Sequence, residues 1–377
     1  MLYKSSIVIK IQIRVIPSKG ESFLMKSPAL KIYCSKIFEN TQILSKLASQ
    51  RNVELWGVTK GLCGAPELGR IFIDGGCTGI ADSRLDNIRK LAESGLKAKF
   101  LLIRIPMQSE ISDVVELTDS TLVSDMSTIL MLEQECKLRK KNYSVILMIE
   151  AGDLREGVME DALIKMKAGI RSLDRVKIIG IGTNLGCFGG ILPSLENMSF
   201  LVKCKKTVEE ITGYSLEKIS VGGTTSVPML YDGSLPDEIN HLRAGSAMLR
   251  GAIAWRPFAW LKQDAFEFCA EWVEIARKPS KPWGAVELDA FGKTPHFDDI
   301  GPRLRGILAA GRQDIYPEGL RPCDHRLKIL GASSDHLVCD VDETKNKPKI
   351  GDSAVFHVNY AAIMTAATSP YVKKIFM

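Results

Sequence analysis

Short apolar runs alternate with amphipathic segments through the middle of the chain. From residue 53 onward the apolar runs are VELWGVTK, TGIADS, KAKFLLIRI, STLVSD, YSVILMIEAGD, RVKIIGIGTNL and EKISVGGTTS. Segments with helical spacing lie between most of them, for example RLDNIRKLAESGL, MSTILMLEQECKLRKK and ENMSFLVKCKKTVEEITG. Strands and helices that alternate in this way are typical of parallel β/α units. About eight units fit between residues 50 and 252, so the pattern predicts a (β/α)8 TIM-type barrel over residues 26–255.

The pattern differs at the two ends of the chain. After residue 256 the runs AFEFCAEWVEIARK, RLRGILAAGRQD, LKILGASSDHLVCDVD and DSAVFHVNYAAIM have the composition of strands and are separated by turn-rich stretches. We therefore predict a C-terminal β domain over residues 256–377. At the other end, SSIVIKIQIRVI alternates like a strand, but Met25 opens a segment that resembles a fresh start. We expect residues 1–25 to be an N-terminal extension outside the fold, with an additional edge strand as the alternative.

Composition and charge exclude several classes of function. The net charge is +6 without any run of five like charges, so we expect no nucleic-acid partner. The nine cysteines are spaced singly, which favours reduced thiols in the cytoplasm over a disulfide framework or a structural metal site. No window approaches the roughly 18 apolar residues of a membrane-spanning helix, so we expect no membrane partner.

Polar and glycine residues gather where the predicted barrel strands end. In a β/α barrel these ends lie on one face, and active sites are assembled there. The clusters are Thr59-Lys60, Asp82-Ser83, Asp153 to Arg155, Thr183-Asn184, Gly222 to Ser226 and Arg243 to Ser246.

Lys60 is the candidate nucleophile because it ends the apolar run ELWGV. A desolvated amine can form a Schiff base with a carbonyl, and pyridoxal phosphate is the common aldehyde partner. The turns GGTTS and AGS supply the backbone N–H groups and hydroxyls that its phosphate needs. Arg243 would face the pyridine nitrogen and, as a group that accepts no proton, would leave that nitrogen unprotonated. The alternatives are a solvated rim lysine and ordinary Gly-Ser turns.

Several motifs, taken together and in order, resemble one enzyme family. They are GVTKGLCG, ADSRLDNIRKL, GDLREG, GIGTNLGCFGG, SVGGTTS, LRAGSAMLRG, GRQD, SSDHLVCDVD and GDSAVFHVNYAAIMTAATSPYV. Over residues 26–377 the chain resembles the fold-type III pyridoxal-phosphate enzymes of the alanine racemase family, and most of all their ornithine racemase branch.

This resemblance implies roles for individual residues. The implied cofactor-binding residues are Lys60, Asn184, Thr225, Ser226, Arg243, Gly245, Ser246 and Tyr360. Arg155 in GDLREG would hold the substrate carboxylate, with an ion pair to Asp153 or Glu156 as the alternative.

Two departures from the family pattern bear on the substrate. Arg312 in GRQDIYP stands where alanine racemases carry a catalytic tyrosine, and Met148 stands where many carry a modified lysine. The second proton-transfer group is then Arg312 itself or one of three further candidates, namely Tyr316, Asp314 and His336. Asp314 and Asp335 are the expected partners of a distal substrate ammonium, or else loop-capping residues.

The resemblance therefore implies a racemase that interconverts the enantiomers of a basic amino acid, and it favours ornithine as the substrate. It also implies a homodimer in which Arg312, Asp314 and Asp335 act across the interface. Alanine or lysine racemisation is the nearest alternative. A decarboxylase on the same barrel would carry a glutamate in place of Arg243, a metal-dependent lyase would need zinc ligands beyond Cys323 and His325, and a cofactor carrier would lack the β domain.

Overall fold

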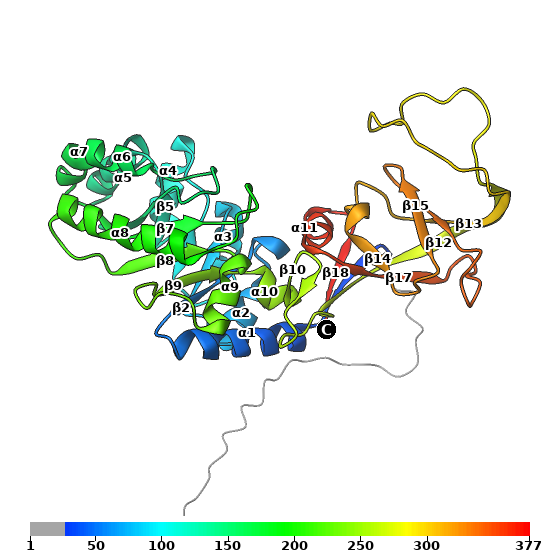
Figure 1. Cartoon of the computed structure of the whole chain (residues 1–377), viewed down its shortest axis with the longest axis horizontal. Helices are drawn as coiled ribbons and strands as arrows, with labels where there is room; N and C mark the ends of the chain where they lie inside the picture. The colour runs from blue at the N-terminus through cyan, green and yellow to red at the C-terminus, as the bar shows by residue number, and fades with distance from the viewer. Residues whose placement is uncertain (1–26) are drawn as a thin grey trace, which may run out of the picture.

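The computed structural model describes residues 27–377, and the predicted extension at residues 1–25 lies outside them. Figure 1 shows two bodies side by side, a barrel surrounded by helices and a mostly β domain. The chain passes between these bodies more than once, because its first strand belongs to the second body.

The first body is a closed barrel of eight parallel strands, as predicted. The strands are β2 (Glu54–Val58), β3 (Gly79–Asp82), β4 (Phe100–Leu102), β5 (Ser120–Val123), β6 (Tyr143–Met148), β7 (Val176–Asn184), β8 (Lys218–Gly222) and β9 (His241–Ala244). Its helices are α1 (Cys34–Ser49), α2 (Pro66–Asp74), α3 (Leu85–Glu93), α4 (Ile111–Leu117), α5 (Met126–Arg139), α6 (Glu160–Leu163), α7 (Lys167–Arg171), α8 (Leu195–Thr212), α9 (Val227–Asp232) and α10 (Ser246–Arg250). The barrel closes because β9 pairs in parallel with β2, with Arg243 opposite Trp56.

The apolar strands bury side chains on both faces. Outward-facing residues join the helices in the main core, and inward-facing residues such as Leu101, Leu122 and Met148 fill the barrel interior. Burial on both faces explains why the strands have continuous apolar runs in the sequence and no alternation.

The second body is an antiparallel sheet to which the chain's N-terminal strand contributes. Its elements are β1 (Ala29–Ile32), β12 (Phe266–Pro279), β13 (Pro302–Leu308), β14 (Leu320–Pro322), β15 (Lys328–Ala332), β16 (Leu337–Asp340), β17 (Ser353–Val358), α11 (Tyr360–Thr368) and β18 (Lys373–Phe376). A short ladder of β10 (Ala252–Ile253) and β11 (Arg256–Pro257) joins the two bodies. In β1, Leu30 pairs antiparallel with Phe268 of β12 and parallel with Lys374 of β18. Although β1 falls in the range predicted for the barrel, it therefore extends the β sheet.

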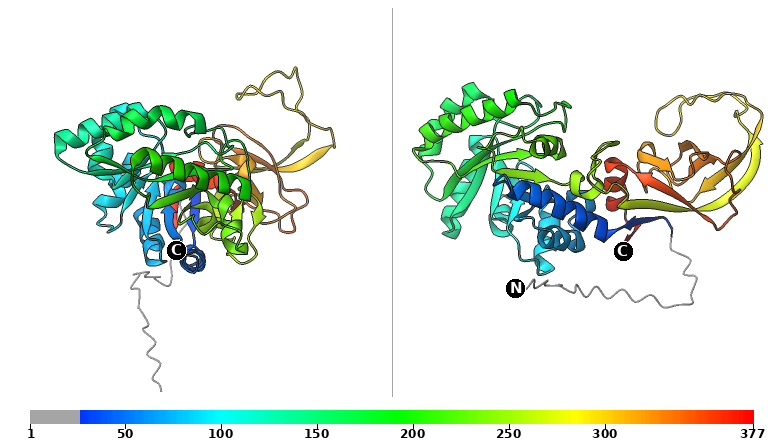
Figure 2. Two further views of the ribbon diagram at one scale, coloured as in Figure 1. Left: turned by 60° about the vertical axis from the view of Figure 1, so that its left-hand side comes forward. Right: turned by 60° about the horizontal axis from the view of Figure 1, so that its bottom comes forward.

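The segment DSAVFHVNYAAIM differs from the strand expected over its whole length. Strand β17 ends at Val358, and α11 begins at Tyr360 because the Asn359 side chain caps it by accepting the Ala362 N–H at 3.0 Å. The right-hand view of Figure 2 shows the red α11 segment between barrel and sheet. There α11 packs against a 3₁₀ turn, η1 (Lys60–Leu62).

Candidate active site

A cavity of about 610 Å³ opens at the carboxyl ends of the barrel strands. Every strand-end cluster that the sequence singled out contributes to its lining or to the loops behind it. Lining residues from these clusters are Lys60, Ser83, Arg155, Asn184, Gly222, Gly223, Thr224, Thr225, Arg243, Gly245 and Ser246, and Tyr360 joins them from α11.

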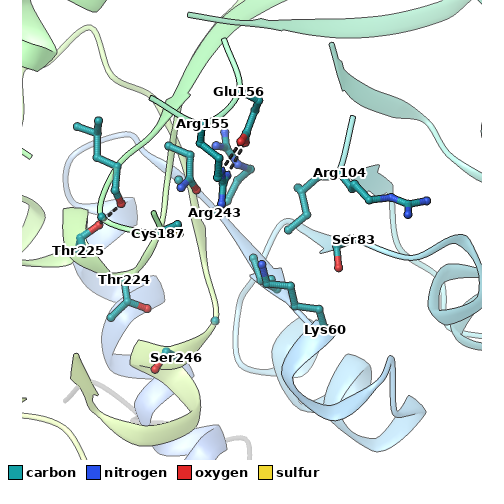
Figure 3. A pocket seen from close by; sticks show the side chains of 18 of the residues that line it. Lys60, Ser83, Arg104, Arg155, Glu156, Cys187, Thr224, Thr225, Arg243 and Ser246 are labelled. Carbon is teal, nitrogen blue, oxygen red and sulfur yellow. Dashed lines mark hydrogen bonds and ion pairs between the residues drawn. The ribbon is translucent and has the colours of Figure 1, made fainter. Parts of the chain in front are cut away.

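Lys60 begins the turn η1 directly after β2 and its side chain points into the cavity (Figure 3). The turn is anchored by buried Thr59, whose hydroxyl donates to Asp82 Oδ2 at 2.6 Å. Asp82 also accepts the Arg84 N–H and the Asn87 amide, at 3.0 and 2.9 Å. Among the residues drawn around the cavity in Figure 3, none forms a hydrogen bond or ion pair with the Lys60 amine, so its nitrogen is available to a ligand.

Arg243 forms the floor of the cavity and is held from behind. Its guanidinium donates to Ser220 Oγ and, at 2.9 Å, to the Thr183 carbonyl. Burial lowers the pKa of Arg243 to about 10, which leaves the group protonated at neutral pH. Because the two bonds fix the plane of the guanidinium, Arg243 presents a donor to the cavity in one orientation.

A buried histidine completes this arrangement. Ser220 Oγ lies 2.7 Å from His241 Nδ1, and the His241 ring packs against Trp56 at 5.2 Å between centroids. Burial, followed by the charge of Arg243, holds the pKa of His241 well below its usual value. Neutral His241 can accept a hydrogen bond from the Ser220 hydroxyl. The Ser220 oxygen can then accept a hydrogen bond from Arg243.

Two glycine-containing turns line the side of the cavity opposite Lys60 (Figure 3). The turn η4 (Thr224–Ser226) follows β8, and Ser246 starts α10 after β9. Thr224 Oγ1 accepts the Ala247 N–H at 2.9 Å and so joins the turns. The first N–H groups of a helical turn have no partner inside it, and here they border the cavity.

Ser226 does not share this position. It is buried behind the lining, and its hydroxyl donates back to the Gly222 carbonyl at 3.4 Å. Thr224 and Thr225 line the cavity in this turn, and the Thr225 hydroxyl donates to the Leu185 carbonyl at 2.9 Å. The 3₁₀ geometry of η4 explains why Ser226 lies behind the lining, since successive side chains point about 120° apart.

A loop after β6 carries Arg155 and Glu156 into the cavity, where they form an ion pair (Figure 3). Of the two ion-pair partners expected for Arg155, Asp153 and Glu156, the structure therefore has Glu156. Asp153 instead accepts backbone N–H groups of Gly186, Phe188 and Gly189 at 2.9 to 3.0 Å.

Residues of the predicted second face do not reach the cavity of their own chain. Arg312 donates to Glu318 at 2.8 Å, and Asp314 is buried and accepts the Gly311 N–H at 2.8 Å. Asp335 accepts from Gln313 and Ser334, whereas the side chain of Tyr316 is exposed. His336 is exposed in the same turn as Asp335. The two aspartates thus have the bonds of loop-capping residues.

Sequence reasoning missed some of the lining. The sequence pattern suggests Glu156 only as a partner for Arg155, and it suggests no role for Arg104 or Cys187. Thr224 lies within the predicted cluster Gly222 to Ser226, but the resemblance implies cofactor binding only by its neighbours Thr225 and Ser226. Strand β4 ends at Leu102, and Arg104 follows it. Because the apolar run continues to Ile105 in the sequence, Arg104 does not stand out as a residue at a strand end.

In residues 27–377 the possible zinc ligands Cys323 and His325 belong to no group that could hold a metal ion. Cys323 lies 3.6 Å from His357 Nε2 and does not pair with His325, and no group of three or more potential metal ligands occurs in this part of the chain. All nine cysteines are free thiols. None of the helices described here is both long and apolar enough to span a bilayer.

The lining fits the predicted pyridoxal phosphate. Lys60 offers an unpaired amine, Arg243 a fixed donor, and the two turns a site for an anion. Asn184 Nδ2 is buried without a hydrogen-bond partner, which is expected of a group that bonds a ligand. A Cβ at Gly222 would lie 2.5 Å from the Arg243 guanidinium, so only glycine leaves space there.

Comparisons with known proteins agree with this geometry. Residues 32–252 match the family model described as "Alanine racemase, N-terminal domain". The chain is 37% identical to the lysine racemase of Thermotoga maritima over 354 residues, which is 93% of this chain and 99% of that protein. It is 36% identical to the ornithine racemase of Acetoanaerobium sticklandii over 356 residues, 92% and 99% of the two chains.

Solved structures share the fold at low sequence identity. The alanine racemase of Streptomyces coelicolor superimposes with a TM-score of 0.74 at 15% identity, covering 95% of this chain and 100% of that one. A D-threonine aldolase from Filomicrobium marinum gives 0.69 at 16% identity, covering 90% and 88%. Fold, motif order and full-length similarity to two curated proteins agree, and the chain belongs to the alanine racemase family.

Proposed function

We propose that this protein is a pyridoxal-phosphate-dependent racemase of basic amino acids, with ornithine or lysine as substrate. The observation that carries the proposal is the convergence of Lys60, Arg155 and Arg243 on one cavity beside two anion-binding turns. The names of the two similar curated proteins support a substrate with a distal amine.

Pyridoxal phosphate, when bound, supplies an aldehyde for the substrate amine and a ring that acidifies the α-proton. In this proposal Lys60 holds the cofactor and its Nζ then takes the α-proton on one face of the substrate. The Arg155 guanidinium binds the substrate carboxylate. The Arg243 guanidinium stays protonated at its place in the floor of the cavity and gives no proton to the pyridine nitrogen.

The phosphate would be bound by the turns at Thr224, Thr225, Gly245 and Ser246, and by the Tyr360 hydroxyl. Burial raises the pKa of Tyr360 to about 12, so the phenol keeps its proton and can donate it to an anion. Asn184 Nδ2 would donate to the cofactor.

The proton on the opposite face requires a second subunit in this proposal. Tyr316 has an exposed ring, and its hydroxyl has no partner within residues 27–377. Arg312 is engaged with Glu318 and stacks 5.0 Å from Phe291. We therefore assign proton transfer to Tyr316 and orientation to Arg312, both acting from the partner in a homodimer.

Incubation with single L-amino acids followed by chiral chromatography tests the activity. We expect D-ornithine or D-lysine to appear and Lys60→Ala to abolish both the product and the visible absorbance of the bound cofactor. Absence of a D-isomer from ornithine, lysine and alanine would refute racemisation.

The nine free thiols support a reducing compartment such as the cytoplasm.

A further inference from the structure

We propose that Glu156 recognises the distal ammonium of the substrate and so selects basic amino acids over amino acids with uncharged side chains. The inference rests on the proposed racemase function and names the residue that sets its substrate class. It replaces the expectation that Asp314 or Asp335 performs this task.

The charges of the cavity single out Glu156. Among residues 27–377 it is the only carboxylate in the lining, which carries four cationic side chains, those of Lys60, Arg104, Arg155 and Arg243. Arg104 is already paired with Glu110 at 2.5 Å. A cation entering the cavity would therefore meet one negative group, the carboxylate of Glu156.

The Arg155–Glu156 pair is complementary to a molecule with both charges. The substrate carboxylate can take the place of Glu156 on the Arg155 guanidinium, and a distal ammonium can take the place of Arg155 on the Glu156 carboxylate. An amino acid with an uncharged side chain provides a carboxylate for Arg155 but no ammonium for Glu156. It leaves Glu156, whose side chain is 18% exposed, without its cationic partner, and a poorly hydrated unpaired carboxylate is unfavourable.

The loop that carries the pair is fixed by backbone bonds. Glu150 accepts the N–H groups of Gly152, Leu154 and Arg155 at 2.6 to 3.2 Å. At its base Ile149 forms a parallel bridge with Val158. The loop can therefore keep Arg155 and Glu156 at the cavity while the two side chains exchange partners.

The two aspartates expected from sequence already have other partners. Asp314 is buried and bonded to the Gly311 N–H, and Asp335 accepts from the Gln313 amide and the Ser334 hydroxyl. Recruiting either one would require these bonds to break, whereas Glu156 only exchanges one cation for another.

The test compares L-ornithine with L-norvaline, which has the same carbon chain without the distal amine. We expect Glu156→Gln to lower kcat/KM for ornithine about 10- to 100-fold, the factor that a charge-assisted hydrogen bond provides. The inhibition constant of norvaline against ornithine should stay unchanged or improve, because Arg155 is released. The matched control is Asp335→Asn, which should leave both constants near wild type.

Two results would overturn the inference. One is an equal loss for ornithine and norvaline in Glu156→Gln, which would assign Glu156 to the orientation of Arg155. The other is a selective loss for ornithine in Asp335→Asn alone. Cofactor absorbance of each variant reports folding and loading independently. A wild-type protein that racemises no basic amino acid would refute the proposed function itself. This outcome differs from that of an active racemase whose preference for ornithine is unchanged in Glu156→Gln.

Discussion

Arg243 receives its orientation from two residues that never reach the cavity. The Arg243 guanidinium can only donate, so the Ser220 oxygen accepts from it, and a neutral His241 ring can accept at Nδ1 from the Ser220 hydroxyl. Protonated His241 would donate at Nδ1, and the Ser220 hydroxyl would have no acceptor there. Protonation of His241 would therefore disturb the hydrogen bonds behind Arg243.

Stability should therefore depend on the protonation of His241. A histidine whose pKa is lowered by folding contributes stability above the pKa of the unfolded chain, about 6.5, and this contribution is lost as the pH falls below it. The slope can reach about 1.4 kcal/mol per pH unit. Urea unfolding between pH 5 and pH 8 measures it. A His241→Gln variant should show a shallower slope than wild type, and equal slopes would contradict the assignment.

Ser220→Ala removes the acceptor behind Arg243 and leaves a buried guanidinium N–H unpaired. We expect a loss of about 1–3 kcal/mol in the free energy of unfolding, together with weaker cofactor binding. Ser226→Ala is the control, because its hydroxyl makes a long 3.4 Å bond and does not reach the cavity. Similar losses in both variants would show that Ser220 has no special role.

Individual residues were foreseeable in different degrees. Lys60 and Arg243 follow from the rule that strand ends converge, since each ends or follows an apolar run. Glu156 was hidden because adjacent opposite charges in a loop are usually a solvated pair. Only the curvature of the loop after β6 brings both side chains to the cavity.

At the scale of elements, the loop from Ile149 to Val158 depends on Gly157. This glycine has φ +155°, and a Cβ there would lie 2.4 Å from the Glu150 backbone nitrogen. No L-residue fits without displacing the chain that carries Arg155 and Glu156.

Gly157→Ala should therefore raise the KM for ornithine at least about tenfold, because both side chains that we propose to bind the substrate would move. Gly213→Ala is the matched control, since Gly213 also has positive φ, at +81°, but open space around its Cβ. Steady-state kinetics of the two variants distinguish the effects. A KM in Gly157→Ala no higher than that in Gly213→Ala would show that the loop does not depend on Gly157.

The misread segment at Tyr360 has a clear physical origin. Residues 352–358 alternate like a strand, and the apolar residues of YAAIM continue the run without a turn signal in between. Asn359 is the cap that separates the two elements, and its effect depends on a hydrogen bond to the Ala362 N–H. The resulting helix places Tyr360 beside η1, where a Cβ on Gly61 would lie 3.2 Å from the Tyr360 ring.

At the scale of the whole molecule, barrel and β domain are joined through Arg250. Its buried guanidinium donates to the Val358 carbonyl at 3.1 Å and to the Ala254 carbonyl at 2.6 Å. These bonds fix the end of β17 relative to the barrel, and hence the start of α11. The β domain thus contributes Tyr360 to the cavity of its own chain, whereas Tyr316 is not among the residues that line that cavity.

Subunit complementation tests whether Tyr316 acts across a dimer interface. Lys60→Ala and Tyr316→Phe are co-expressed with different tags, each being defective alone. Heterodimers would contain one intact site, so a random mixture should regain about a quarter of wild-type activity. Light scattering checks for the dimer. No recovery in purified heterodimers would place Tyr316 and Lys60 in the same subunit's site, or Tyr316 outside catalysis.

The sequence by itself determined the barrel, the β domain that follows it and the strand ends that carry Lys60, Arg155 and Arg243. It could do so because burial on both faces of a parallel strand leaves an apolar run that stops where the active-site face begins. Tertiary structure alone decided that β1 joins the distant sheet, that Ser226 points away, and that Glu156 faces the cavity with Arg155. These outcomes depend on partners far apart in the chain or on the direction of a loop, neither of which a local pattern of apolar and polar residues encodes.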